Sequence, residues 1–361
     1  MRAEPAQRVF VIAEAGVNHN GSVELGEQLI DAALAAGADA VKFQSFRAES
    51  LVSRSAPRAS YQVRNQPGEQ SQLEMLRRLE LGEAAQRRLC EHARERGIEF
   101  MSTPFDLESL EFLVDGLKVK RLKIGSGEIT NAPLLLRAAQ SRLPLIVSTG
   151  MSTLDEVQAA LGVIAFGLRG AEPPRGSAAF AAAAASPSAR GALAQRVTLL
   201  HCTSDYPAPV ADLNLRAMHT LREKFGLAVG LSDHSAGTAA AIAAAALGAS
   251  AIEKHFTLDR NLPGPDHRAS LEPAELRAMI DSIRDACAAL GSGAKAPTAA
   301  EVDIRAVARR SLVAARAIRK GERLGAADIA VKRPGGGVSP MYYWDWIGKS
   351  AERDYEKDDL L

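Results

Sequence analysis

Two histidines stand where a metal ion could be bound. His234 and His255 lie in the segments GLSDHS and IEKHFT, each at the end of a short apolar run of the kind that forms buried strands. If these two strands are neighbours in a parallel sheet, both imidazoles reach the same edge and could share one divalent ion, with positions left for water and substrate. A histidine is also often a packed or hydrogen-bonded side chain, and two ligands do not identify a metal.

A second group of residues could bind an anion. Lysines supply charge, hydroxyls donate hydrogen bonds, and glycines let backbone N–H groups approach, as in phosphate and carboxylate sites. The members of this group are Lys42, Lys123, Ser126, Ser148 and Ser232, with Gly125, Gly127 and Gly150 beside them. The alternative is that Lys42 and Lys123 form ion pairs with Glu14 and Glu128.

Two carboxylates, Glu14 and Glu128, also follow apolar runs, where an ionised group is costly unless it is paired or has a task. Each is therefore a general acid or base, an anchor for a substrate hydroxyl, or a partner in a salt bridge. Tyr206, in the segment YPAP, is either an aromatic over the site or a loop anchor. Asp266 lies in PGPD, a rigid turn that could project it at a substrate.

A barrel scaffold would bring these residues together. Eight apolar runs alternate with amphipathic stretches, and the runs are apolar throughout, as expected for strands covered on both faces. The pattern predicts a (β/α)8 TIM barrel of the α/β class, with its active site at the C-terminal ends of the strands. The predicted strands are 9–13, 40–44, 98–101, 119–124, 144–148, 197–201, 227–231 and 251–255, and the predicted helices are 22–36, 82–96, 153–166, 215–225, 237–247 and 273–290.

The remaining segments fall outside this alternation. The connection 45–80 is long enough to predict a lid or a helix of its own. The Ala-rich tract 178–185, within an insertion at 170–195, is predicted to be a mobile surface segment. We predict a barrel domain at 1–293, a linker at 294–305 and a small mostly-β domain at 306–361, with β elements at 311–315, 318–324 and 329–333.

The bulk composition favours a small-molecule enzyme. A formal net charge of +1 gives no general attraction to nucleic acid or to a membrane surface, so neither is an expected partner. No run approaches the ~20 apolar residues of a membrane helix, and the N-terminus lacks the apolar core of a signal peptide. Three cysteines are too few for a disulfide framework, so a cytoplasmic location is expected.

Ten short motifs in order resemble those of the bacterial sialic acid synthase family, the phosphoenolpyruvate-dependent synthases of N-acylneuraminate and related nonulosonic acids. They are EAGVNHNG, VKFQ, MSTPF, KIGSGEITN, STGMS, LHCTSDYPAP, GLSDHS, EKHFT, PGPD and VKRPGGG, the last resembling the family's antifreeze-like SAF domain. The resemblance covers nearly the whole chain. It implies a transferase that condenses phosphoenolpyruvate with N-acetylmannosamine or a related acylamino sugar and releases phosphate.

The resemblance also implies roles for individual residues. The implied catalytic residues are Glu14, His234 and His255, and the two histidines are the implied ligands of Mn²⁺, with Mg²⁺ or Co²⁺ as alternatives. The implied phosphoenolpyruvate-binding residues are Lys42, Thr103, Lys123, Ser126, Ser148, Ser204 and Ser232. The implied sugar-binding residues are Gln44, Glu128, Tyr206, Asp266 and Arg333.

In this family the small domain covers the barrel of the partner subunit, so the resemblance implies a domain-swapped homodimer in which Arg333 reaches the neighbour's substrate. One residue departs from the pattern: members that make N-acetylneuraminate can carry Asn where this chain has Ser204. A legionaminic or pseudaminic acid synthase, with the same chemistry on a diacetamido sugar, is therefore the alternative. A non-catalytic sugar-binding protein is a further one, which the metal pair and anion group argue against.

Overall fold

The computed structural model describes residues 8–59, 62–63, 71–170, 174 and 176–361. The chain divides into two compact units, Met1–Ser292 and Gly293–Leu361. None of the helices in the described ranges is long and apolar enough to cross a membrane.

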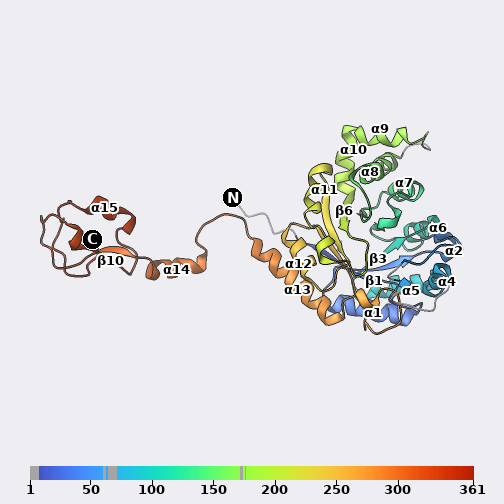
Figure 1. The fold of residues 1–361 in the computed structure, drawn as a ribbon, viewed down its shortest axis with the longest axis horizontal. Helices are drawn as coiled ribbons and strands as arrows, with labels where there is room; N and C mark the ends of the chain where they lie inside the picture. The colour runs from blue at the N-terminus through green and yellow to red at the C-terminus, as the bar shows by residue number, and fades with distance from the viewer. Residues whose placement is uncertain (1–7, 60–61, 64–70, 171–173, 175) are drawn as a thin grey trace. The chain divides into compact units, whose positions relative to one another are not determined.

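Parallel strands form the centre of the first unit (Figure 1). Among its described residues, eight strands pair in the order β3-β2-β1-β8-β7-β6-β5-β4, and the two outermost, β3 and β4, contact each other to nearly close a barrel. The strands are β1 (Phe10–Gly16), β2 (Ala40–Ser45), β3 (Glu99–Pro104), β4 (Leu122–Ile124), β5 (Leu145–Ser148), β6 (Val197–Cys202), β7 (Ala228–Asp233) and β8 (Ala251–His255). This confirms the predicted TIM barrel followed by a second small unit.

Helices cover the outside of the barrel through apolar faces. In α1 the buried residues Gly26, Leu29, Ile30 and Ala33 follow helical spacing, so one stripe faces the strands. The helices between strands are α1 (Val23–Ala35), α5 (Glu83–Arg96), α6 (Leu107–Glu111), α7 (Ala132–Gln140), α8 (Leu154–Leu168), α11 (Ala217–Phe225) and α12 (Ala239–Ala246), and α13 (Pro273–Leu290) follows β8. The sequence pattern missed α6 and α7.

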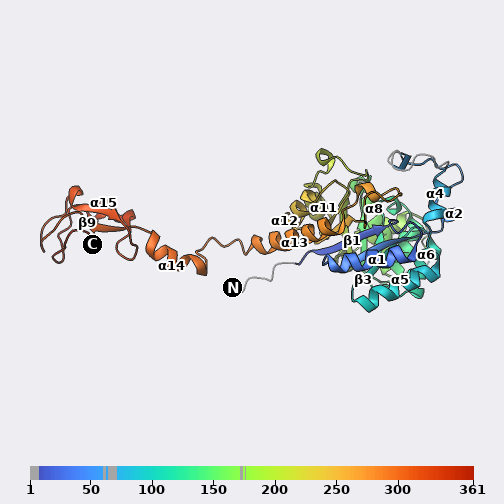
Figure 2. The same cartoon turned by 90° about the horizontal axis from the view of Figure 1, so that it is seen from below.

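The connection after β2 contains helices of its own, as predicted. In it, α2 (Ala48–Leu51) and α4 (Gln72–Leu79) lie side by side (Figure 2) and share a small apolar cluster that includes Ala48, Met75 and Leu76. The connection follows the C-terminal end of β2, so these helices lie near the barrel mouth. Residues 60–61 and 64–70 of this connection lie outside the described residues.

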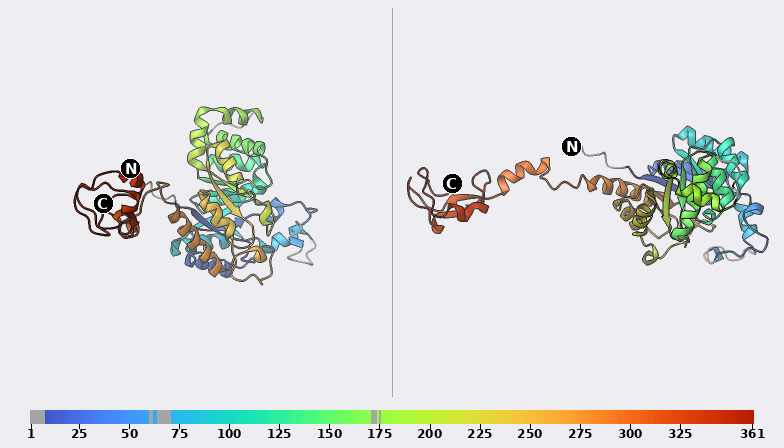
Figure 3. Two further views of the ribbon diagram at one scale, coloured as in Figure 1. Left: turned by 60° about the vertical axis from the view of Figure 1, so that its left-hand side comes forward. Right: turned by 90° about the horizontal axis from the view of Figure 1, so that it is seen from above.

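The described part of the Ala-rich insertion at 170–195 is helical, residues 171–173 and 175 lie outside the described residues, and the mobility of the insertion stays a prediction. Its helices α9 (Ala178–Ala185) and α10 (Pro187–Arg196) stand beside α8 on the outside of the barrel (Figure 3). Phe180 packs edge-on against Phe166 at a centroid distance of 5.4 Å, and its carbonyl lies against Gly162 of α8. Alanine has the highest helix propensity and its small side chain permits close packing, which explains the helices.

The second unit contains a two-stranded antiparallel sheet of β9 (Ser311–Ala314) and β10 (Ile329–Lys332), with α15 (Tyr343–Trp346) after it. Its core includes Leu312, Ile318 and Tyr355. The predicted strand at 318–324 forms single bridges, from Ile318 to Tyr355 and from Arg323 to Ser350. The segment predicted as a linker carries α14 (Ala299–Ala308), because Thr298 and Glu301 form a capping box that starts a helix.

Candidate functional site

The C-terminal ends of the barrel strands surround a cavity of about 360 Å³, the mouth cavity. The predicted site residues that line it are Glu14, Lys42, Gln44, Thr103, Lys123, Ser126, Glu128, Ser148, Ser204, Tyr206, Ser232, His234, His255 and Asp266. Arg333 belongs to the second unit, where it follows β10 and is exposed. The structure therefore brings together every predicted site residue of the barrel.

Strand register explains this convergence. Glu14 of β1 pairs with Lys42 of β2 on one side and with His255 of β8 on the other. Ser232 of β7 pairs with Glu253 of β8. Residues two apart on a strand share a face, so Glu253 and His255 both point inward while Lys254 between them points outward.

The imidazole rings of His234 and His255 lie close together in the wall of the mouth cavity. Their ring centroids are 5.4 Å apart, and the Tyr206 ring lies 4.2 Å from His234 and 5.5 Å from His255. His234 Nδ1 lies 2.8 Å from the Thr203 carbonyl oxygen, which can only accept, so Nδ1 carries a proton. Burial would lower the pKa of His234, but the neighbouring Cys202 thiol outweighs burial and raises it. The Tyr206 hydroxyl oxygen lies 3.2 Å from His234 Nε2.

This donor set fits a divalent ion. Burial, with the nearby His234, lowers the pKa of His255 well below its usual value, so this imidazole is neutral. Within the described residues its Nδ1 is buried without a hydrogen-bond partner. The described residues contain no group of three or more His, Cys, Asp or Glu side chains that is arranged to hold a metal ion. The two imidazoles would therefore need water or substrate oxygens to complete a coordination sphere.

Two lysines form another part of the site. Lys42 Nζ lies 2.7 Å from Glu14 Oε2 and donates to Thr103 Oγ1 at 3.0 Å. Lys123 Nζ lies 3.2 Å from Glu253 Oε1. The predicted ion-pair alternative is therefore present for Lys42, whereas the partner of Lys123 is Glu253 and not Glu128.

The carboxylates here have shifted pKa values. Burial raises the pKa of Glu14 to about 7, against the opposing effect of Lys42. Burial would also raise the pKa of Glu253, but Lys123 and Lys42 outweigh it and hold this carboxyl well below its usual range. Glu14 can thus gain or lose a proton near neutral pH, and Glu253 stays ionised.

Hydroxyl groups gather beside Gly150. Ser126 Oγ accepts a hydrogen bond of 3.0 Å from the Gly150 N–H. A Cβ at residue 150 would lie 2.3 Å from Ser204 Oγ and 2.8 Å from Ser126 Oγ, so this close approach requires glycine. Ser148 Oγ is buried, and within the described residues it has no hydrogen-bond partner. The Ser148 hydroxyl can therefore donate to an anionic oxygen.

Two further carboxyl groups line the cavity. Glu128 accepts a hydrogen bond of 2.7 Å from Asn131, and burial raises its pKa. Burial raises the pKa of Asp266 to about 6, against the effect of His234. Both are placed to bind hydroxyl or amide groups of a polar substrate.

Sequence reasoning missed two ionisable residues among those described around the mouth cavity, Glu253 and Cys202. Glu253 could have been found from strand parity with His255. Cys202 lies in the motif LHCTSDYPAP, which gave it no role, and its Sγ lies 3.6 Å from His234 Nδ1 and 3.5 Å from Ser126 Oγ. Burial would raise the pKa of this thiol, but His234 lowers it to about 7.

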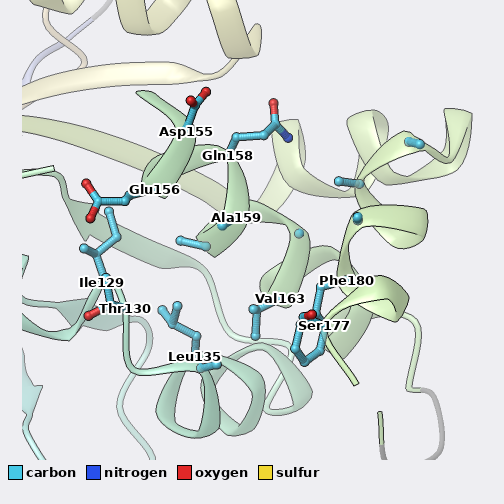
Figure 4. A pocket seen from close by; sticks show the side chains of 16 residues that line it. Ile129, Thr130, Leu135, Asp155, Glu156, Gln158, Ala159, Val163, Ser177 and Phe180 are labelled. Atoms are coloured by element: carbon cyan, nitrogen blue, oxygen red, sulfur yellow. The ribbon is translucent and has the colours of Figure 1, made fainter. Parts of the chain in front are cut away.

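A larger cavity of about 740 Å³ lies elsewhere, between α7, α8 and α9 (Figure 4). Its wall is mostly apolar, with Leu135, Val163 and Phe180 inside and Asp155 at the edge. Among the described residues that line it there is no lysine, arginine or histidine, in contrast to the mouth cavity. The mouth cavity, at the C-terminal face of the barrel, is therefore the candidate active site.

A TIM barrel whose mouth combines two lysines, several hydroxyls and two imidazoles is typical of an enzyme for an anionic substrate. The profile of the NeuB family matches residues 29–295, and that of the SAF domain matches residues 309–361. This protein belongs to the NeuB family, which confirms the resemblance seen in its motifs.

Comparison with individual proteins supports this family assignment. The chain is 44% identical to the N,N'-diacetyllegionaminic acid synthase of Campylobacter jejuni over 98% of this chain and 99% of that protein. It is 47% identical to the enzyme of the same name from Legionella pneumophila over 94% of this chain and 89% of that protein. The crystal structure of the sialic acid synthetase of Leptospira borgpetersenii has a TM-score of 0.65 and 32% identity, covering 84% of this chain and 92% of that one.

Proposed function

We propose that this protein is a phosphoenolpyruvate-dependent nonulosonic acid synthase. It condenses phosphoenolpyruvate with the open-chain aldehyde of an N-acylated amino sugar and one water: a C–C bond forms, the C–O bond to the phosphate breaks, the water supplies the new keto oxygen, and phosphate is released. The observation that carries the proposal is the juxtaposition, in one cavity, of Lys42 and Lys123 with the His234–His255 pair. Membership of the NeuB family and the names of its relatives support it.

The lysine half of the mouth cavity is assigned to phosphoenolpyruvate. Two ammonium groups offset the substrate's charge in a site from which most water is excluded, where charge-assisted hydrogen bonds are strong. The phosphoenolpyruvate-binding residues of the proposal are Lys42, Thr103, Lys123, Ser126, Ser148, Ser204 and Ser232. The partnerless Ser148 hydroxyl is a donor that an anionic oxygen would satisfy.

The histidine half is assigned to the sugar aldehyde. His234 and His255 would hold a divalent ion, Mn²⁺ with Mg²⁺ or Co²⁺ as alternatives, and such an ion supplies Lewis-acid polarisation of the aldehyde and binds water. Glu14, with a pKa of about 7, moves a proton at the reacting oxygen. Gln44, Glu128, Tyr206 and Asp266 contact the hydroxyl and acylamino groups of the sugar.

For the acceptor we propose a 2,4-diacetamido sugar, as in the legionaminic acid synthases. The identity to those two enzymes is 44% and 47%, against 32% to the sialic acid synthetase. Ser204, where N-acetylneuraminate-forming members can carry Asn, is consistent with this choice.

Phosphate release tests the acceptor. Phosphoenolpyruvate and Mn²⁺ are supplied with N-acetylmannosamine, with a 2,4-diacetamido mannose-type sugar or with its altrose-type counterpart, each with and without a chelator. We expect chelator-sensitive release that is fastest with the mannose-type diacetamido sugar. Preference for N-acetylmannosamine would establish a sialic acid synthase instead, and no release with any sugar would refute the proposed function.

We further propose a domain-swapped homodimer in which Arg333 completes the partner's site. Arg333 is exposed and precedes a glycine-rich segment, which leaves its guanidinium free to bind an acyl group. Mixing two inactive variants, His234→Ala and Arg333→Ala, tests this. Exchange of subunits should restore up to about a quarter of wild-type activity, since one site in the mixed dimer then has both residues. No recovery after proven exchange would contradict the swap.

A further inference from the structure

One buried carboxylate joins three of the side chains assigned to phosphoenolpyruvate. Glu253 Oε1 lies 3.2 Å from Lys123 Nζ and accepts a hydrogen bond of 2.9 Å from Ser232 Oγ, while its Oε2 lies 3.8 Å from Lys42 Nζ. We propose that Glu253 is a positioning residue, which holds the Lys123 ammonium and the Ser232 hydroxyl in the orientation that binds phosphoenolpyruvate. This inference rests on the proposed function.

The topology makes Lys123 dependent on Glu253. Ser232 and Glu253 are direct partners on the adjacent strands β7 and β8. Lys123 lies on β4, which is not paired with β8 in the sheet, so its contact with Glu253 crosses the barrel interior. A four-carbon side chain that reaches across a barrel has many rotamers, and a fixed carboxylate at the far side selects one of them.

Burial strengthens this dependence. The side chains of Lys123 and Glu253 are 4% and 5% exposed. A buried ammonium without a partner loses its proton or distorts its surroundings, because desolvation penalises the charged form. Lys42 has Glu14 at 2.7 Å as a second partner. Removal of the Glu253 charge is therefore expected to disturb Lys123 more than Lys42.

A negative charge beside an anion site also repels the substrate, so two effects compete. The repulsion is reduced because two ammonium groups flank the Glu253 carboxylate, at 3.2 Å and 3.8 Å. Loss of the Lys123 ammonium would remove a charge-assisted bond to the substrate directly. We therefore expect the positioning effect to exceed the repulsion.

A double-mutant cycle on the full-length protein tests the inference. The dissociation constant of phosphoenolpyruvate is measured by calorimetry for wild type, Glu253→Gln, Lys123→Met and the double variant, with Glu223→Gln on the exposed side of α11 as a charge-removal control. Glu253→Gln should raise the constant about tenfold, as expected for a lost charge-assisted contact. On the Lys123→Met background the same change should raise it less than about twofold.

Any result that differs from these two expectations overturns the inference. An unchanged or tighter constant in Glu253→Gln would show that repulsion dominates, and additive effects in the cycle would show that Glu253 does not act through Lys123. If Glu253→Gln does not fold, Glu253→Asp, which keeps the charge, must bind more tightly than Glu253→Ala, and the reverse order counts against the role. A wild-type protein that binds no phosphoenolpyruvate would instead refute the proposed function itself.

Discussion

Replacing Gly150 by alanine adds a single methyl group at the most crowded point of the mouth cavity. The new Cβ would lie 2.3 Å from Ser204 Oγ, 2.8 Å from Ser126 Oγ and 3.1 Å from Cys202 Sγ. Non-bonded heavy atoms settle about 3.5 Å apart, so the Ser204 hydroxyl must move by roughly 1 Å. The backbone at residue 150 is not in the left-handed region, so the effect comes from the contact and not from strain in φ.

The expected result is a loss of activity that exceeds the loss of stability. A displacement of about 1 Å at a positioned group costs about 100-fold in rate, or about 2.7 kcal/mol of transition-state stabilisation. Overpacking is expected to lower the free energy of unfolding by about 1–3 kcal/mol, which leaves the protein folded. The assay is kcat/KM for phosphoenolpyruvate at saturating sugar, read as phosphate release.

Gly191→Ala is the matched control. Residue 191 lies within α10, and a Cβ there meets no described heavy atom within 4 Å. This change should leave activity intact and stabilise the helix by about 1 kcal/mol. If Gly150→Ala keeps an activity within threefold of wild type, the idea that the Ser126 and Ser204 hydroxyls hold a reacting group in place is refuted.

Three further predictions concern charges. Asp233 and Lys254 form a fully buried ion pair of 2.8 Å next to the two histidines in the sequence. In urea unfolding, Asp233→Asn should lower the free energy of unfolding by about 3–5 kcal/mol, and the double variant with Lys254→Met should recover most of that loss. The same loss in the single and the double variant would contradict a pairing role. Burial lowers the pKa of His19 from 6.5 to about 4, so the unfolded chain binds a proton that the folded protein does not and stability falls as pH drops below about 6.5. Wild type should lose about 2 kcal/mol more than His19→Gln between pH 7 and pH 5, and parallel profiles would contradict this. His234→Ala should abolish turnover and weaken Mn²⁺ binding in calorimetry, whereas unchanged activity would exclude it as a ligand.

The apolar pattern predicted where each barrel strand lies but not where it ends. β3 continues to Pro104 and β7 to Asp233, past the predicted ends at 101 and 231. Two of the added residues, Thr103 and Ser232, are polar and line the mouth cavity. Functional side chains thus interrupt the hydrophobic signal while the backbone is still paired.

Other features were missed although a signal existed. Asn131 caps α7 by accepting from the Leu134 N–H, and Pro133 stands in its first turn, a combination typical of a helix start. Glu253 was passed over because it lies inside an apolar run, where only alternation with His255 marks it as inward-facing. Its partnership with Lys123 spans 130 residues, a tertiary contact that no local pattern encodes.

The central claim, that the mouth cavity condenses phosphoenolpyruvate with an acylamino sugar, is tested most directly by stoichiometry. Phosphate released, sugar consumed and the nonulosonic acid formed are measured together, by colorimetry and mass spectrometry, in wild type and in Lys123→Met. We predict one phosphate and one nine-carbon acid for each sugar consumed by wild type, and at least about 100-fold slower formation of both in the variant, because a buried charge-assisted contact to the anion is lost. Phosphate release without a sugar-derived acid, or full activity in Lys123→Met, would contradict the claim.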